Sequence, residues 1–293
     1  MNIKEYIKNK RSTLSKSSID TYNSILVNLY KSVFDKDEIN TDDFNDSKKI
    51  LKHLDTLPNN KRKTILSALV VITDNDDYRK QMLKDIDDFN TDIDKQEKTE
   101  TQKNNWIDTL DINELYSDLK KTAQALYRLK HLSPSDYQLI QNYVIISLLG
   151  GIYIPPRRSK DYIDFKIKNI NPETDNYLKG KKLYFSSYKT SKTYGLQVID
   201  IPTQLHTILK KWISINPTEY LFFDSKMNRL TNVKLNQRIN KLFNNKKVGV
   251  NSFRHAFLTD KYKNLSDKLD EMDNDFKKMG SSRSQFKTYV KND

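Results

Sequence analysis

The sequence contains no cysteine, so it can form neither a disulfide nor a thiolate metal site. Its six glycines include no glycine-rich phosphate loop. No apolar run approaches the ~18 residues of a membrane span, and the N-terminus does not have the pattern of a signal peptide. Four histidines are scattered without the spacing of metal ligands: His53, His131, His206 and His255. We therefore expect a soluble, intracellular protein that uses neither a metal ion nor a cofactor.

Positive charge is what the sequence has in excess. The 293 residues carry 51 Lys and Arg against 38 Asp and Glu, a net charge of +13. Residues 1–100 are nearly balanced, with 18 basic and 19 acidic residues, whereas residues 151–250 hold 19 basic and 7 acidic ones. A coding bias towards lysine is the alternative explanation, but it does not account for an excess confined to one window. We expect an anionic partner for that part of the chain.

The first part of the chain, residues 1–95, has the pattern of a small helical unit. Apolar residues recur at steps of three and four over 16–34, and further helices are expected at about 42–55, 60–73 and 75–90. The acidic run DNDD at 74–77 is typical of a solvated turn rather than of a metal site. Residues 96–105 are charged and aperiodic, which predicts a linker.

Three adjacent cations stand at the start of the helix expected at 60–73: Lys61, Arg62 and Lys63. Backbone N–H groups at a helix start favour phosphate, so these cations are candidates for an anion contact. A solvated helix end is the alternative.

Residues 106–293 predict a larger unit of the α+β class, mainly helical with a small antiparallel sheet. Ser133 and Pro134 have the pattern of a cap and a first helical residue, which opens a helix over 134–149. Two strand patterns at 182–188 and 196–202 are joined by a turn, as in a hairpin. The remaining helices are expected at about 111–128, 203–215, 231–243, 251–264, 266–279 and 281–290.

Two stretches of this unit gather cations suited to phosphate. IPPRRSKDY (154–162) places two arginines before a short helix, and the planar fork of arginine suits two phosphate oxygens at once. Asp161 follows Arg158 by three residues, a spacing at which it can hold that guanidinium. YKTSKTYG (188–195) places lysines on the hairpin turn. A routine surface ion pair and an ordinary turn lysine are the alternatives.

Two later stretches complete the set. NSFRHAFLTDKY (251–262) sets Arg254 beside His255, and two adjacent residues can face one ligand only at the start of a helix. MGSSRSQFKTYVKND (279–293) carries Tyr289 near the end of the sequence. Each stretch by itself also fits an ordinary helix end or surface.

Together and in this order, the four stretches resemble the catalytic domain of the tyrosine recombinases, the phage integrase family. That family carries Arg, Lys, His-x-x-Arg, His or Trp, and Tyr in this order, on a helical domain with a small sheet that follows a helical core-binding domain. PPRRSKDY and YKTSKTYG…IDIP look most like the recombinases of large DNA viruses, virophages and related mobile elements. The resemblance implies a core-binding domain at 1–95, a linker at 96–105 and a catalytic domain at 106–293.

The resemblance also implies roles for the basic residues. Arg158 matches the first arginine, with Asp161 as its acidic support and Arg157 as the alternative. Lys189 matches the hairpin lysine, with Lys192 as the alternative.

The other matches lie in the last two stretches. Arg254 and His255 match the second arginine and the histidine after it, and Tyr289 matches the nucleophile. Two positions depart from the family pattern: Asn251 stands in place of a histidine, and Ser281 in place of a histidine or tryptophan. Both can still donate a hydrogen bond to phosphate, but neither can act as a base near neutral pH.

Strand cleavage and rejoining through a covalent 3′-phosphotyrosine, without metal or nucleotide, is the activity that the resemblance implies. The partner is then double-stranded DNA, with the cations at 61–63 as DNA contacts and a homotetramer on DNA as the assembly. Two alternatives remain at this point. One is a weakened relative that only binds DNA, and the other is a type IB topoisomerase, against which the core-binding domain argues.

Overall fold

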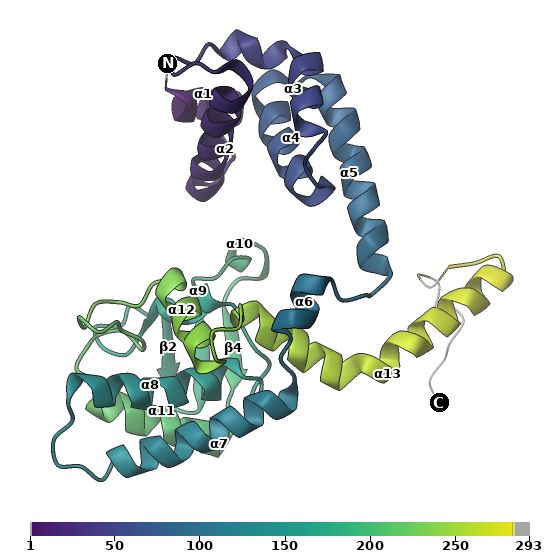
Figure 1. The fold of residues 1–293 in the computed structure, drawn as a ribbon. Coiled ribbons are helices and arrows are strands. Elements are labelled where there is room, and N and C mark those ends of the chain that lie inside the picture. The colour runs from purple at the N-terminus through teal and green to yellow at the C-terminus, as the bar shows by residue number, and fades with distance from the viewer. Residues whose placement is uncertain (1, 283, 285–293) are drawn as a thin grey trace. The chain divides into compact units, whose positions relative to one another are not determined.

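The computed structural model describes residues 2–282 and 284. The chain divides into two compact units, Met1–Thr99 and Glu100–Asp293, which Figure 1 colours in chain order. Among the described residues, no helix combines the length and apolar character needed to cross a membrane.

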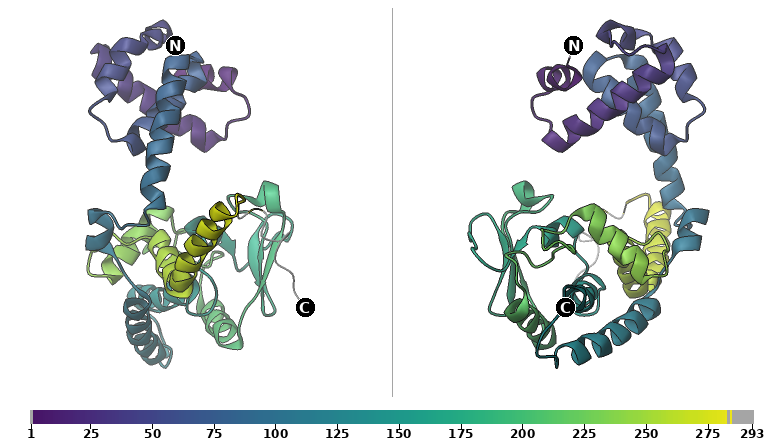
Figure 2. Two further views of the ribbon diagram at one scale, coloured as in Figure 1. Left: turned by 90° about the vertical axis from the view of Figure 1, so that its right-hand side faces the viewer. Right: turned by 60° about the vertical axis from the view of Figure 1, so that its left-hand side comes forward.

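The first unit is helical throughout its regular structure. Its helices are α1 (Ile3–Lys10), α2 (Lys16–Phe34), α3 (Ser47–Leu54), α4 (Asn59–Thr73) and α5 (Asp76–Asp94), with a short 3-10 helix, η1, at Thr41–Asn45. Helix α4 packs against both α2 and α5, as the views of Figure 2 show from two further sides. Three fully buried aromatic side chains fill the space between the helices: Tyr30, Phe44 and Tyr78.

The second unit combines helices with one small sheet. Its helices are α6 (Glu100–Asn105), α7 (Thr109–Leu126), α8 (Pro134–Leu149), α9 (Ser159–Ile163), α10 (Ser191–Tyr194), α11 (Thr203–Ile215), α12 (Asn232–Leu242) and α13 (Val250–Lys278). The strands are β1 (Phe165–Lys166), β2 (Asn176–Lys179), β3 (Lys182–Phe185) and β4 (Gln197–Asp200), which lie in this order across the sheet.

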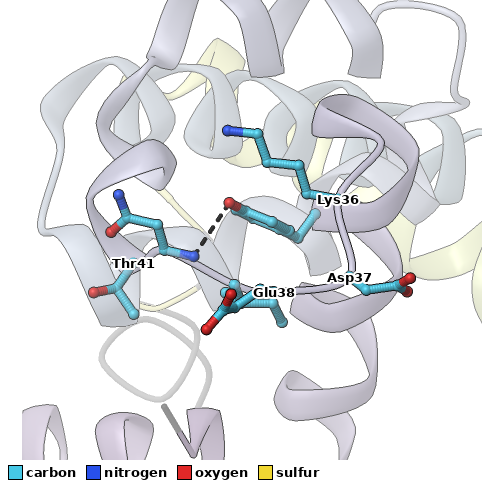
Figure 3. A pocket seen from close by; sticks show the side chains of 7 residues that line it. Lys36, Asp37, Glu38 and Thr41 are labelled. Atoms are coloured by element: carbon cyan, nitrogen blue, oxygen red, sulfur yellow. Dashed lines mark hydrogen bonds between the residues drawn. The ribbon is translucent and has the colours of Figure 1, made fainter.

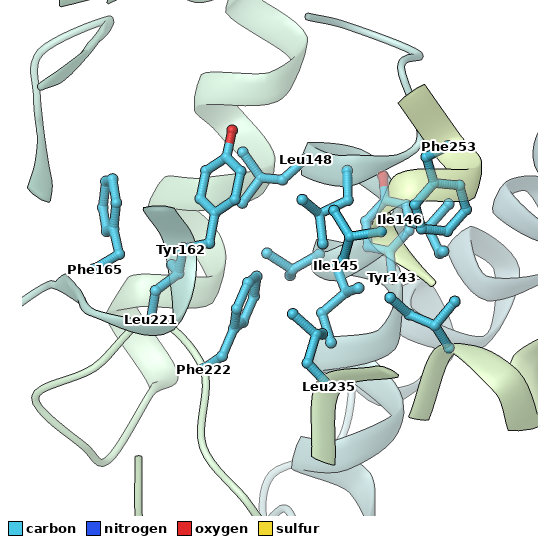
Figure 4. Close-up of a cluster of buried hydrophobic side chains, with 14 of the residues drawn as sticks. Tyr143, Ile145, Ile146, Leu148, Tyr162, Phe165, Leu221, Phe222, Leu235 and Phe253 are labelled. Carbon is cyan, nitrogen blue, oxygen red and sulfur yellow. The ribbon is translucent and has the colours of Figure 1, made fainter. Parts of the chain in front are cut away.

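Helix α8 forms the centre of the second unit. Ser133 accepts a hydrogen bond from the backbone of Asp136 and Pro134 is the first helical residue, so the helix begins where the sequence predicts. Its second half is buried on every side. Figure 4 shows its Ile145 and Leu148 among side chains from other parts of the unit, Phe222 and Phe253 included. This core supports the segments that carry the polar stretches.

The fold class expected from the sequence is confirmed, with three differences in detail. The sheet is mixed rather than antiparallel, because β1 pairs in parallel with β2. Residues 100–105, expected to be part of a linker, form helix α6. The two helices expected at 251–264 and 266–279 are one helix, α13, which bends along its course in Figure 1.

Candidate active site

The two arginines of the IPPRRSKDY stretch lie where the chain enters α9. Arg158 is the N-cap of this helix and its backbone is extended, with φ −70° and ψ 151°. Its side chain is exposed, whereas that of Arg157 is only 15% exposed. The two neighbours therefore have different surroundings, although the sequence does not distinguish them.

Asp161 pairs with Arg157, not with Arg158 as the three-residue spacing predicts. The distance from Arg157 Nε to Asp161 Oδ2 is 2.9 Å. The prediction is wrong because Arg158 caps α9 from outside the helix, so the geometry of helical neighbours does not apply to it.

The Asp161 carboxylate is a buried negative charge among cations. Its side chain is 3% exposed, and Oδ1 has no hydrogen-bond partner among the described residues. Burial raises the pKa of Asp161, while the positive charges of Arg157, Arg158 and Arg254 act to lower it. Asp161 is therefore bound by Arg157 and lies within electrostatic reach of Arg158 and Arg254, which come from two separate stretches.

The start of α13 is held against the loop that leads to α9. Phe257, one turn after Arg254, and Pro156, next to Arg157, both lie beside Gly151. Gly151 has φ +78°, and a Cβ placed there would come within 2.9 Å of the Phe257 ring, so glycine permits both the backbone conformation and the close approach. This contact places the first turns of α13 beside the loop that carries the arginines at 157–158.

The first turn of α13 orients Arg254 through its own side chains. Arg254 Nη1 donates to Asn251 Oδ1 at 3.3 Å, across one helical turn. His255 is exposed, and its ring lies 6.4 Å from that of Trp106. The amide of Asn251 therefore uses its oxygen to hold Arg254, and its NH₂ group is not part of that bond.

The lysines of the YKTSKTYG stretch lie on the connection between β3 and β4. These strands pair in an antiparallel ladder, as the hairpin pattern predicts. Tyr188 is buried, and its hydroxyl donates to the Gly195 carbonyl at 2.7 Å, which closes the base of the connection. Lys189 and Lys192 are exposed beyond this point.

Ser281 is a predicted site residue that the described part of the chain does not bring to the arginines. Ser281 follows the end of α13, where its N–H donates to the Phe276 carbonyl at 2.8 Å. In Figure 1 this end of α13 extends away from the helix's own beginning. Tyr289 lies outside the described residues.

Only one of the three cations predicted as DNA contacts is exposed. Lys61 is exposed, but Arg62 binds the fully buried Asp85 and Lys63 lies over the Phe89 ring. A guanidinium that neutralises a buried carboxylate has a structural role, so we expect Lys61 rather than Arg62 to be the DNA contact of this stretch. No sequence signal points to this pair, because 23 residues separate its members.

Elsewhere the described residues offer little for catalysis. A shallow pocket in the first unit is lined by Tyr30 and by residues 36–41, including Lys36 and Glu38 (Figure 3). The Tyr30 hydroxyl is satisfied there, since it donates to Asp43 and accepts from the Asn40 N–H. No group of three or more His, Asp or Glu residues that could hold a metal ion occurs in the part of the chain that the structure describes.

Comparison with known proteins gives limited similarity. No family model and none of the curated proteins matches the sequence. The chain is similar to a crystal structure of the XerH site-specific recombinase bound to its difH substrate in a pre-cleavage complex, with 14% identity, a TM-score of 0.40, and coverage of 89% of this chain and 84% of that one. A post-cleavage complex of XerH with a palindromic difH substrate has the same identity and coverage, and a TM-score of 0.41. Similarity of this size does not identify a family.

Proposed function

We propose that the chain is a DNA strand-transferase of the tyrosine-recombinase kind, which cleaves and rejoins duplex DNA through a covalent 3′-phosphotyrosine. The observation that supports this most is that the start of α13, which carries Arg254, lies beside the loop that leads to Arg157 and Arg158, with the buried Asp161 carboxylate bound by Arg157 and within electrostatic reach of the other two. The lysine-bearing hairpin is tied to the same cluster, because Arg157 Nη1 donates to Gln197 on β4 at 2.7 Å. Excess cations on a rigid scaffold fit a phosphodiester.

The reaction is a transesterification in which bonds are exchanged and none is lost. The phenol oxygen of Tyr289 attacks the scissile phosphorus, its proton passes to a base, and the bond from phosphorus to the 5′ oxygen breaks. A 5′ hydroxyl of the same or another strand then attacks the phosphotyrosine and releases the tyrosine. Because the phosphotyrosine conserves the phosphodiester energy, no nucleotide is consumed.

Each residue of the cluster has a role in this reaction. Arg158 and Arg254 neutralise the negative charge that develops on the non-bridging oxygens, the kind of preorganised stabilisation that is usually the largest catalytic contribution. Lys189 protonates the departing 5′ oxygen, with Lys192 as the alternative. His255 accepts the tyrosine proton, since it is the only histidine beside the arginines in the sequence.

The first unit supports the second by binding the duplex. Lys61 is its exposed candidate for a phosphate contact. Recombination between two duplexes requires every exchanged strand to be cut, so we expect a homotetramer to assemble on DNA. An element that integrates into other DNA, viral or otherwise, is the setting that fits this activity.

A suicide substrate tests the proposal directly. A nicked duplex loses its 5′ hydroxyl fragment after cleavage, so a covalent adduct accumulates and is seen as a shifted band in denaturing gels. We expect an adduct with the parent chain and none with Tyr289→Phe, which should bind duplex DNA within a few-fold of the parent, because affinity comes from many phosphate contacts. An adduct that persists in Tyr289→Phe and maps to another tyrosine would contradict the assignment.

A second candidate function is DNA binding without cleavage. It is favoured by Ser281, which α13 carries away from the arginines, and by Asn251, which replaces a base by an amide. A parent chain that binds duplex DNA but forms no adduct at any pH would support it. Cleavage that survives EDTA would separate the strand-transferase from a metal-dependent nuclease, for which we expect complete loss of cleavage.

A further inference from the structure

Arg157 makes its contacts within the protein, as a structural residue does, rather than leaving its guanidinium open to bind phosphate. Its Nε donates to Asp161 at 2.9 Å and its Nη1 donates to Gln197 Oε1 at 2.7 Å. The guanidinium carbon lies 4.0 Å from the centroid of the Phe185 ring and 5.3 Å from that of Tyr188. The guanidinium therefore contacts a carboxylate, an amide oxygen and two aromatic rings, and the side chain is 15% exposed.

These contacts join α9 to both sides of the hairpin. Asp161 belongs to α9, Phe185 ends β3, and Gln197 begins β4. Tyr188 stands between them, one residue before Lys189. A single guanidinium therefore connects the helix that follows Arg158 with the two strands from which the lysines extend.

Asn176 makes a second connection between the same parts. It is fully buried on β2, and its Nδ2 donates to the Asp161 carbonyl at 2.9 Å and to the Ser187 carbonyl at 2.7 Å. Its Oδ1 accepts from the Ser187 N–H at 2.9 Å. The backbone two residues before Lys189 is therefore fixed to α9 through a side chain whose donors and acceptor are all used.

We propose that Arg157 is a positioning residue that, with Gln197, holds the lysine-bearing hairpin over the phosphate bound by Arg158 and Arg254. The proposal rests on the proposed function and assigns the two adjacent arginines to different tasks. A lysine side chain is long and has several rotatable bonds, so a general acid of this type depends on where its backbone is held. A misplacement of about 1 Å can cost roughly 10²-fold in rate.

Leaving-group chemistry distinguishes positioning of the lysine from contact with the phosphate. In a duplex with sulfur in place of the bridging 5′ oxygen, the leaving group is a thiolate. Thiols have a pKa of ~8.5, so this sulfur departs without a proton. A variant that has lost the general acid should recover on this substrate, whereas a variant that has lost charge stabilisation should not.

The test variant is Gln197→Ala. It removes the hydrogen bond between Arg157 and the hairpin and leaves the Arg157–Asp161 pair intact. Arg157→Ala also strips a buried carboxylate of its ion pair and risks the fold. Gln204→Ala, an exposed glutamine on α11, is the matched control. Lys189→Ala and Lys192→Ala identify the general acid, and Arg158→Ala is the reference for lost phosphate contact.

We expect Gln197→Ala to slow single-turnover cleavage of ordinary DNA by about 10-fold or more. The alanine variant of whichever lysine is the general acid should slow the same reaction by about 10²-fold. Both should approach the parent rate on the sulfur substrate, while Arg158→Ala stays slow on both. Equal defects of Gln197→Ala on the two substrates, or full activity on ordinary DNA, would overturn the proposal.

Hydrogen–deuterium exchange of the DNA-free protein supplies a readout that does not need cleavage. We expect faster exchange over residues 186–196 in Gln197→Ala, with α8 and the Gln204→Ala control unchanged. Unchanged exchange over 186–196 would show that the hairpin is not held this way. A third outcome is that Gln197→Ala exchanges faster over 186–196 but the parent protein forms no adduct on either substrate. That result would confirm the structural connection and would reject both its catalytic role and the proposed function.

Discussion

Arg62 holds both carboxylate oxygens of Asp85, with Nε at 2.8 Å from Oδ2 and Nη2 at 2.6 Å from Oδ1. The Asp85 side chain has no exposed surface and also accepts from Gln81 at 2.8 Å. Although burial acts to raise the pKa of Asp85, the hydrogen bonds from Arg62 and Gln81 keep it below its ordinary value of 3.8. This pair connects α4 to α5, which gives Arg62 a structural role.

We predict that Arg62→Ala lowers the free energy of unfolding of the first unit by about 3–5 kcal/mol, since it leaves an uncompensated buried charge. Arg79→Ala is the matched control, because Arg79 pairs with Asp74 and Asp76 at the surface, where such pairs contribute about 0–1 kcal/mol. Urea unfolding followed by circular dichroism measures both. Equal effects of the two variants would contradict the structural role of Arg62.

The neighbouring Lys61 should affect DNA binding but not stability. Lys61→Ala is expected to leave the stability unchanged and to reduce the salt dependence of duplex binding by the equivalent of about one released counterion. A binding titration over a range of salt concentrations measures this slope. An unaltered slope would remove Lys61 from the DNA interface.

The pH dependence of stability that Asp161 causes should have the opposite sign from that of Asp85, because the two pKa values are shifted in opposite directions. Burial raises its pKa above 3.8, so the folded state binds this proton more tightly than the unfolded chain does. Its contribution to stability is then complete below 3.8 and is lost as the pH rises through its folded-state pKa. Asp161→Asn cannot titrate and keeps an oxygen for Arg157. We predict that the stability of the parent relative to Asp161→Asn falls as the pH rises above 3.8.

Urea unfolding of both proteins at a series of pH values tests this sign. A parent that gains stability relative to Asp161→Asn as the pH rises would show that the three arginines outweigh burial, and that the pKa of Asp161 is lowered in the folded state.

The two arginines assigned to phosphate should matter more than a neighbouring surface cation. We predict that Arg158→Ala and Arg254→Ala each slow single-turnover cleavage by roughly 10²-fold or more, the scale of losing one preorganised charge. Lys160→Ala is the control, because Lys160 is exposed on α9 two residues from Arg158. If Lys160→Ala were as damaging as Arg158→Ala, general attraction to DNA rather than transition-state stabilisation would account for the effect.

The direction of α13 leads to a prediction about which protomer supplies the nucleophile. The helix carries Ser281 away from Arg254 of the same chain (Figure 1), and Tyr289 follows Ser281 by eight residues. We expect the tyrosine of one protomer to act beside the arginines of another. Tyr289→Phe alone should form no adduct and Arg254→Ala alone should form it slowly, so a mixture of the two should form adducts faster than either protein by itself. A mixture that is no faster than Arg254→Ala alone would indicate that α13 rearranges to act within one chain.

Features set by local sequence were predictable. Ser133 and Pro134 mark the start of α8, and apolar steps of three and four mark α2, because caps and periodicity depend on neighbours along the chain. The parallel strand β1 was not predictable, since its two residues, Phe165 and Lys166, are too few to show a period.

Side-chain contacts between residues far apart in the sequence could not be predicted from local sequence patterns. Arg62 and Lys61 are neighbours in sequence, and only the fold shows that one is bound to Asp85 and the other exposed. Arg157 and Arg158 differ for a similar reason, because Gln197, which accepts from Arg157, lies 40 residues further along the chain. The sequence predicts which stretch carries the arginines, but it does not divide the proposed tasks between two adjacent residues.

Asn251 is the position where the chain departs from the recombinase pattern beside an otherwise matching arginine. Its Oδ1 accepts from Arg254 Nη1 at 3.3 Å, so one function of the side chain is to orient that guanidinium. Its NH₂ group can at the same time donate to a phosphate oxygen. We predict that Asn251→Ala slows cleavage more than Asn251→His does, because imidazole retains a hydrogen-bonding nitrogen and alanine retains none.

The pH dependence of single-turnover cleavage separates this role from proton transfer. If the parent lacks a proton acceptor, Asn251→His should raise the rate, most clearly above pH ~6.5, where imidazole is neutral and can accept a proton. We expect no such gain, because His255 is adjacent to Arg254 and supplies a titrating group. Asn251→Asp is the matched control, since it keeps the oxygen that holds Arg254 but sets a negative charge beside the phosphate, and it should be slower than the parent at every pH where the carboxylate is ionised. A parent that binds DNA without cleaving it, together with cleavage restored by Asn251→His, would show that the missing base and not the hydrogen bond limits this site.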